Sequence, residues 1–360
     1  MPSEIMIIGP SPEIKKAGGI VTHIRTLMSL SVFKNAQIFD PESIYGKLSP
    51  RIFAIFVRIF LLRKTIRICK CKVILINTSI QSSSLAKLML IFYAIPKKLK
   101  KNTLIFFHGG RFDKAGFLKC NLIRASLKRI VYGGCHFYFL SKAQSVGFER
   151  LFPSSPINFF RNFSDSNEII DRCETTSKTV RIIYVGRIVA AKGVFDIIEA
   201  FSKIVSEKKS KNVKLTLVGD GKEFTKIQKI VKGRSLSSVN LTGYLHGKKL
   251  DEIYRNSDIF VLPSYHPEGF PYTIIEAMRS GLAIVASPKG ILSEIIKDGI
   301  TGFKVAPGYV DGLVEIIKKL INDSKLRNRI GRNNQNFFKE NLSKRAAESF
   351  YQDLLSQYIR

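Results

Sequence analysis

Residues 180–193 read VRIIYVGRIVAAKG, and this stretch indicates the type of fold. Its apolar run, 180–185, which only Arg181 interrupts, is typical of a strand that is buried on both faces of a parallel sheet. Gly186-Arg187 follows the run directly, and Lys192-Gly193 precedes a segment with helical spacing. Ligands of open α/β sheets bind at the carboxyl ends of the strands, so this loop is a candidate ligand site.

The same alternation of apolar runs and helical segments continues in both directions along the chain. We expect strands at 4–9, 72–77, 103–108, 136–140, 180–186, 213–219, 239–242, 258–263 and 283–286, and helices that begin near residues 20, 83, 114, 141, 193, 222, 248, 271 and 292. A polar, acidic junction at 163–178 separates the two series. The pattern predicts two doubly wound α/β domains with parallel sheets.

Composition is that of a globular protein, but the charge is unusual. The 360 residues are 45% hydrophobic, which excludes disordered and collagenous classes. Lys and Arg number 58 against 28 Asp and Glu, a net charge of +30. Residues 1–165 hold 26 of these basic residues and 7 of the acidic ones. Such a field favours an anionic partner: nucleic acid, acidic lipid or a phosphorylated substrate.

The sequence indicates a cytoplasmic protein. Its five cysteines are scattered and odd in number, which fits a reducing compartment rather than a disulfide framework. The N-terminus lacks the basic and apolar regions of a secretory signal, and no apolar run approaches the roughly 20 residues that span a bilayer. We expect no metal site.

Two basic segments, 51–68 and 114–129, interleave Lys and Arg with bulky apolar residues. Helices of this composition lie at the surface of anionic membranes, so we expect peripheral contact with the inner face of the cytoplasmic membrane. The alternative is that both apolar faces pack into the core of the protein's own fold.

Several loops could bind phosphate. Gly18-Gly19 precedes a helix, where backbone N–H groups can approach an anion, although this signal alone is weak. Arg187 and Lys192 place two cations at the end of one strand, which suits a diphosphate. Residues 263–278 read PSYHPEGFPYTIIEAM, in which Pro271 is suited to the first position of a helix and Glu276 lies inside that helix.

Glu268 and Glu276, with seven residues between them, resemble the E-x7-E signature of retaining GT-B glycosyltransferases of family 4, the glycosyl transferases group 1. The resemblance extends over nearly the whole chain. It implies two facing Rossmann-like domains with a cleft between them: 1–165 for the acceptor and 166–342 for the nucleotide sugar. It also implies a C-terminal helix within 343–360 that crosses back onto the first domain.

The resemblance also assigns roles. Arg187 and Lys192 would bind and stabilise the diphosphate leaving group, Glu276 the ribose hydroxyls, and Glu268 the transferred sugar, while His108 would lie near the reacting carbon. The remaining donor-binding residues would be Gly18, Gly19, Tyr244, Leu245, Gly269, Phe270, Pro271, Tyr272 and Thr273. His23, His136, His246 and His266 are interpreted as structural or incidental, with the alternative that His266 lines the donor pocket.

The implied reaction is sugar transfer without a cofactor or a metal, and the lack of an Asp-x-Asp motif in the chain is consistent with metal independence. The cosubstrate would be a nucleotide sugar, UDP-sugar favoured over GDP-sugar, and the acceptor a lipid-linked saccharide of bacterial surface polysaccharide, lipopolysaccharide or O-antigen assembly. Two alternatives remain at this point: a non-enzymatic nucleic-acid-binding protein, against which the lack of a recognition motif counts, and a sugar-nucleotide epimerase. The sequence does not define the oligomeric state.

Overall fold

The computed structural model describes residues 4–13, 18–41, 51–112, 121–171, 179–207 and 212–359, with the side chains of 51–56, 58 and 121–123 left aside. It divides into two compact units: Met1–Asp165 with Lys344–Arg360, and Ser166–Ser343. Residues 172–178 of the expected junction lie outside the described residues. We call the two parts unit 1 and unit 2.

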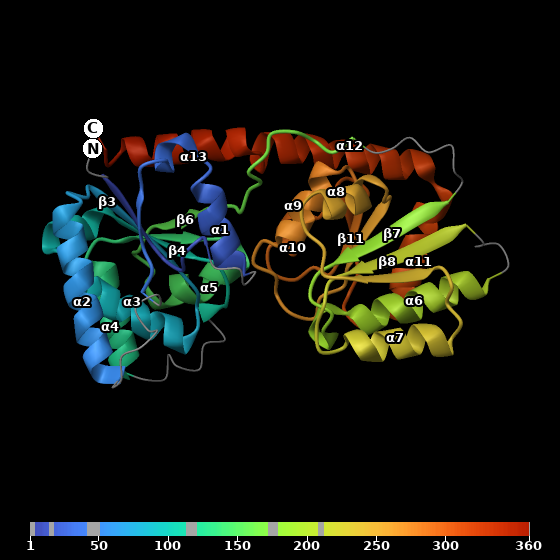
Figure 1. Ribbon diagram of the computed structural model, residues 1–360, viewed down its shortest axis with the longest axis horizontal. Coiled ribbons are helices and arrows are strands. Elements are labelled where there is room, and N and C mark those ends of the chain that lie inside the picture. Colours follow the sequence, from blue (N-terminus) through green and yellow to red (C-terminus); the bar gives the residue numbers. More distant parts are fainter. Residues whose placement is uncertain are drawn as a thin grey trace. The chain divides into compact units, whose positions relative to one another are not determined.

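Unit 1 contains a six-stranded parallel sheet in the order β2-β1-β3-β4-β5-β6. Its strands are β1 (Ile5–Ile8), β2 (Gln37–Phe39), β3 (Val73–Thr78), β4 (Thr103–Phe107), β5 (His136–Phe139) and β6 (Ile157–Phe159). Its helices are α1 (Gly19–Leu27), α2 (Arg51–Ile68), α3 (Ser82–Ala94), α4 (Asn121–Tyr132), α5 (Lys142–Leu151) and α13 (Lys344–Ser356), with 3₁₀ turns η1 (Ser31–Phe33) and η3 (Lys97–Asn102). Figure 1 shows α2, α3 and α4 lying together, with α13 on another side of unit 1.

Unit 2 contains a second six-stranded parallel sheet, in the order β12-β11-β10-β7-β8-β9. Its strands are β7 (Val180–Val185), β8 (Val213–Val218), β9 (Val239–Gly243), β10 (Ile259–Leu262), β11 (Ala283–Ala286) and β12 (Gly302–Lys304). Its helices are α6 (Val194–Ser206), α7 (Phe224–Gly233), α8 (Lys248–Arg255), α9 (Tyr272–Arg279), α10 (Leu292–Ile295), α11 (Val310–Asn322) and α12 (Ser324–Asn341), with a 3₁₀ turn η6 (Ala190–Lys192).

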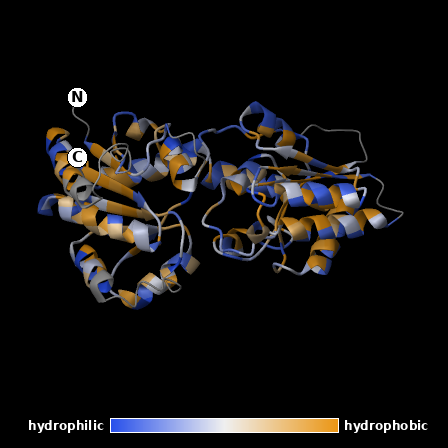
Figure 2. Ribbon diagram, turned by 60° about the horizontal axis from the view of Figure 1, so that its bottom comes forward, coloured by the Kyte–Doolittle hydropathy of each residue, from blue (hydrophilic) through white to orange (hydrophobic). Residues whose placement is uncertain are grey.

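The strands form where continuous Val, Ile, Leu and Phe runs occur, and they are buried because helices cover both faces of each sheet. Figure 2 shows apolar residues concentrated in these strands in both units. Three edge strands, β2, β6 and β12, were not expected. Each has only three residues, too few to give a periodic signal.

Among the described side chains of 51–68 and 114–129, some apolar residues are buried and others, such as Phe60 and Ile68 of α2, are exposed, so membrane contact stays a prediction. Leu62 and Ile66 of α2, and Leu127 and Ile130 of α4, are buried in the core of unit 1. The apolar residues of α2 are spread around its axis instead of forming one face. Residues 114–120 lie outside the described part. Among the described helices, none combines the length and the apolar character needed to cross a bilayer.

Candidate active site

The loops after β7 and β10 meet because these strands are neighbours in the sheet of unit 2. In a parallel sheet, the carboxyl ends of adjacent strands lie at one edge, so residues far apart in sequence converge there. Gly193 allows a close approach between the two loops. Its φ is 75°, and a Cβ at this position would lie 2.3 Å from the carbonyl oxygen of Pro263.

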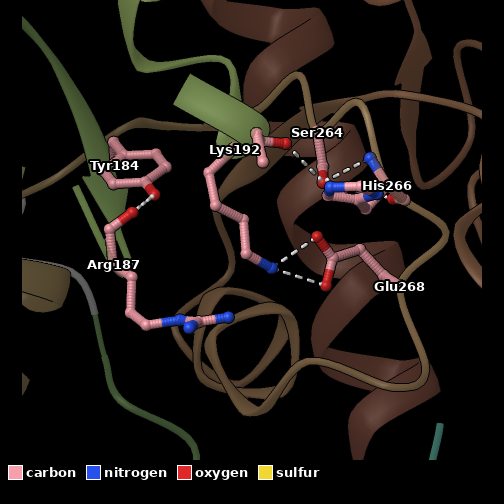
Figure 3. Close-up of polar contacts among 7 residues, drawn as sticks. Tyr184, Arg187, Lys192, Ser264, His266 and Glu268 are labelled. Atoms are coloured by element: carbon pink, nitrogen blue, oxygen red, sulfur yellow. Dashed lines mark hydrogen bonds and ion pairs between the residues drawn. The ribbon is translucent and has the colours of Figure 1, made fainter. Parts of the chain in front are cut away.

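Lys192 and Glu268 form an ion pair across this contact. The Lys192 Nζ lies 2.6 Å from Oε1 and 2.7 Å from Oε2 of Glu268 (Figure 3). Only 20% of the Lys192 side chain and 10% of the Glu268 side chain are exposed. A part-buried pair of this geometry holds both groups in place, because a carboxylate out of water needs its counter-charge.

Arg187 lies on the same side of the loop and is exposed. Figure 3 shows its guanidinium pointing toward the Lys192–Glu268 pair, and it makes no hydrogen bond or ion pair within the described part of the chain. The Tyr184 hydroxyl donates to the Arg187 carbonyl oxygen at 2.7 Å and so fixes the backbone of this residue. Burial, followed by the charge of Glu268, raises the pKa of Tyr184, so the phenol stays a neutral donor.

The segment that carries Glu268 is bound to a second loop. Glu268 and Gly290 form an isolated parallel bridge, and the Ile291 N–H donates to the Glu268 carbonyl oxygen at 3.2 Å. A Cβ on Gly290, whose φ is 65°, would lie 2.0 Å from that oxygen. The glycine is therefore required by the packing of the Glu268 backbone.

Helix α9 begins at Tyr272, one residue later than expected, because Pro271 has an extended backbone and precedes the helix. The Pro271 carbonyl oxygen accepts from Ile274 N–H at 3.1 Å. Thr273 lies in the first turn, whereas the Phe270 side chain is buried in the core, so only the backbone of Phe270 could meet a ligand. The helix N-terminus carries the partial positive charge that anionic ligands favour.

Glu276 has a neighbour that the sequence did not reveal. The fully buried Tyr254 of α8 donates its hydroxyl to the Thr273 carbonyl oxygen at 3.2 Å. Burial raises the pKa of Tyr254 well above its ordinary value, and the charge of Glu276 and a hydrogen bond to it raise this pKa further. Sequence patterns could not find Tyr254, because it lies on another helix, outside the motif.

The structure brings Lys192 and Glu268 into contact, with Arg187 beside them, whereas Glu276 lies inside α9, which follows the same loop. Tyr244 follows β9 at the carboxyl edge of the unit 2 sheet, with an exposed side chain beside Leu245. The other expected site residues belong to unit 1: Gly18 and Gly19 are exposed at the start of α1, and His108 follows β4. Within the described residues, no group of three or more His, Cys, Asp or Glu could hold a metal ion.

The two Rossmann-like domains, each with a parallel six-stranded sheet, define the GT-B fold that the sequence predicted. HepE of Anabaena, solved in complex with UDP, matches it with a TM-score of 0.73 and 16% identity over 98% of this chain and all of that chain.

Residues 165–337 match the model of the family described as glycosyl transferases group 1. Unit 2 therefore belongs to the glycosyl transferases group 1, as the E-x7-E pattern predicted.

Curated relatives match at lower coverage. An uncharacterized glycosyltransferase of Methanocaldococcus jannaschii is 25% identical over 72% of this chain and 64% of its own length. The capsular polysaccharide biosynthesis glycosyltransferase CapM of Staphylococcus aureus is 31% identical over 57% of this chain and 54% of its own length. The chain thus spans between half and two thirds of the length of these two relatives.

Proposed function

We propose that this protein is a retaining glycosyltransferase that moves a sugar from a nucleotide diphosphate to a hydroxyl of a lipid-linked saccharide. Unit 2 holds the donor and unit 1 the acceptor. The observation that carries the proposal is the cluster of Arg187, Lys192 and Glu268 beside the start of α9. HepE, which shares the fold, was solved with UDP, and this supports UDP over GDP.

Charge development explains the role of each group. As the bond from the anomeric carbon to the diphosphate breaks, negative charge grows on the leaving oxygen, which Arg187 and Lys192 stabilise from fixed positions. The acceptor oxygen bonds to the anomeric carbon on the same face, and its proton passes to the departing phosphate oxygen. Glu268 and Glu276 are poor candidates for a facing pair of carboxylates, since Glu268 lies in the loop before α9 and is paired with Lys192, whereas Glu276 lies within α9 beside Tyr254.

The ion pair fits donor binding in a second way. Without a donor, Glu268 neutralises Lys192, so the cation is held in position without an unpaired charge. An incoming diphosphate offers Lys192 a stronger partner, and the Glu268 carboxylate is then available to accept from a sugar hydroxyl. Glu276 takes the ribose hydroxyls, with Tyr254 keeping its carboxylate oriented.

We propose an acceptor in bacterial surface polysaccharide assembly, as the CapM relative suggests, and a protein that is cytoplasmic and peripheral on the membrane. Support comes from an outer face of unit 1, which we call the α2–α4 face: Phe60, Arg63, Tyr93, Arg129 and Tyr132. Arg63 Nη2 lies 2.9 Å from the Tyr93 carbonyl oxygen, and Arg129 Nη1 lies 3.1 Å from its hydroxyl. Phe60 is 66% exposed and Tyr132 is 81% exposed.

Residues 51–112 contain no Asp or Glu, so no acid from this segment offsets the positive charge of the α2–α4 face. Exposed aromatic rings beside cations favour the interface of an anionic bilayer.

The test of membrane contact is sedimentation with phosphatidylglycerol vesicles, with phosphatidylcholine vesicles for comparison. Arg63→Ala should weaken binding about fivefold, from about 1 kcal/mol per cation. The control is Tyr309→Ala, which removes an exposed tyrosine of unit 2 and should leave vesicle binding unchanged. Equal binding to phosphatidylglycerol and phosphatidylcholine vesicles would refute the proposed contact with an anionic membrane.

The donor site is tested by thermal shift and calorimetry with UDP, GDP and their common sugars. A bound nucleotide raises Tm by mass action. We expect the shift with UDP, and its loss in Lys192→Ala and Glu276→Ala but not in Arg234→Ala, which removes an exposed ion pair elsewhere in unit 2. Stabilisation by DNA or RNA and by no nucleotide would favour the nucleic-acid-binding alternative that the net charge of +30 suggests.

A further inference from the structure

Two histidines of unit 1 lie in contact, and only one of them was assigned a role. His23 of α1 is fully buried, and its ring centroid lies 4.5 Å from that of His108, with 56° between the ring planes. Phe160 lies edge-on to both rings, at 5.5 Å from His23 and 5.1 Å from His108. His23 therefore covers part of the ring surface of His108.

The hydrogen bonding of His108 depends on one amide. Its Nε2 lies 2.8 Å from Oδ1 of Asn77, an oxygen that can only accept, so Nε2 carries the proton and Nδ1 does not. Nδ1 is out of contact with water and has no hydrogen-bond partner among the described residues. One hydrogen bond fixes one atom of the ring; contacts on its faces are needed to fix its plane.

Both rings are neutral near pH 7. Burial lowers the pKa of His23 to about 3, an effect partly offset by a hydrogen bond with the Asn162 side chain. Burial also lowers the pKa of His108 well below its ordinary value, and His23 lowers it further. A neutral pair can pack ring against ring in this tilted contact without burying an unpaired charge.

His23 is itself held by the last helix of the chain. The Tyr351 hydroxyl of α13 lies 3.4 Å from the His23 Nε2, although 328 residues separate the two in sequence. Tyr351 is buried, and its ring packs edge-on to Phe33 at 5.2 Å. A continuous series of contacts thus leads from α13 through His23 to His108.

We infer that Tyr351 and His23 are positioning residues for His108: Tyr351 holds the His23 ring, and His23 holds the His108 imidazole in the one orientation in which Asn77 selects the Nε2–H tautomer. The inference rests on the proposed function only in assigning His108 to the reaction. In this arrangement α13, which follows unit 2 in sequence, contributes to the acceptor-side site of unit 1.

The geometric test is NMR of the full chain labelled with ¹⁵N-histidine, which has five histidines. We expect the His108 signal of an Nε2–H tautomer, unchanged in Tyr309→Phe, the control in unit 2. In Tyr351→Phe and His23→Leu, the His108 signal should shift toward a mixture of tautomers. An unchanged His108 signal in both variants would overturn the inference. Tyr351→Phe loses only a hydroxyl, so it keeps the test valid if His23→Leu fails to fold.

The kinetic test separates positioning from folding. Displacement of a catalytic group costs up to about 100-fold in rate, so His23→Leu should lower kcat by roughly 10- to 100-fold and Tyr351→Phe by less. Affinity for UDP, which unit 2 binds, should stay at the wild-type value in both variants. If the His108 signal changes while the wild type transfers no sugar, the positioning stands and the proposed function fails. If transfer occurs and neither variant lowers kcat, the positioning role is refuted.

Discussion

The Lys192–Glu268 pair offers a quantitative test of the site. With both N–O distances near 2.6–2.7 Å, Coulomb attraction amounts to about 6 kcal/mol at an effective dielectric constant of about 20. Loss of hydration offsets most of this, because the two side chains are only 20% and 10% exposed. We therefore expect a net coupling free energy of about 1.5–3 kcal/mol.

A double-mutant cycle measures this coupling. Lys192→Met, Glu268→Gln and the double variant keep side-chain length, and urea unfolding followed by far-UV circular dichroism gives the free energy of each. The matched control is the Arg234–Glu199 pair of the same unit, at 2.7 Å but 44% and 42% exposed. Its coupling should be about 0.2–1 kcal/mol.

Two results would contradict this reasoning. A Lys192–Glu268 coupling no larger than that of the control pair would mean that burial does not strengthen the contact. The second concerns the rise in Tm on adding UDP. We expect Lys192→Met to lose this rise and Glu268→Gln to keep it, because the phosphates of UDP bind the Lys192 ammonium. Loss of the UDP effect in Glu268→Gln alone would show that the carboxylate, not the ammonium, dominates donor binding.

Three further outcomes are expected. Gly290→Ala should destabilise unit 2 by more than about 2 kcal/mol in urea unfolding, since its Cβ would lie 2.0 Å from a backbone oxygen. The control is Gly299→Ala, where φ is 72° and no atom lies within 4 Å of the added Cβ; it should cost only about 1–2 kcal/mol, from the strain of a left-handed backbone. Histidine in the unfolded chain binds a proton below about pH 6.5, whereas buried His23 binds one only near pH 3, so the free energy of unfolding should fall as the pH decreases across this range, by up to about 1.4 kcal/mol per pH unit. In His23→Gln this pH dependence should become weaker. An unchanged dependence would refute the lowered pKa of His23. Tyr254→Phe removes the hydroxyl whose hydrogen bond to Glu276 raises the pKa of Tyr254. It should weaken UDP binding in calorimetry by about 3- to 10-fold, from the roughly 0.5–1.5 kcal/mol of one hydrogen bond; wild-type affinity would exclude a role of Tyr254 in orienting Glu276.

The sequence alone determined the fold and the family of unit 2. Local patterns suffice for this, because a buried parallel strand needs a continuous apolar run, and a phosphate-facing turn needs glycine and cations at fixed spacing. The run at 180–193 and the Glu268–Glu276 spacing are both of this kind. Edge strands of three residues, such as β2, were missed because they are too short to show a pattern.

The tertiary structure decided which of these groups meet. Whether the apolar residues of 51–68 face lipid or core depends on the sheet behind them, and the structure places Leu62 and Ile66 in the core. Lys192 meets Glu268, 76 residues away, because β7 and β10 are neighbours in the sheet. His23 meets Tyr351 because the last helix packs on unit 1. Strand order and helix packing are set by the burial of the whole chain, so no local pattern carries this information.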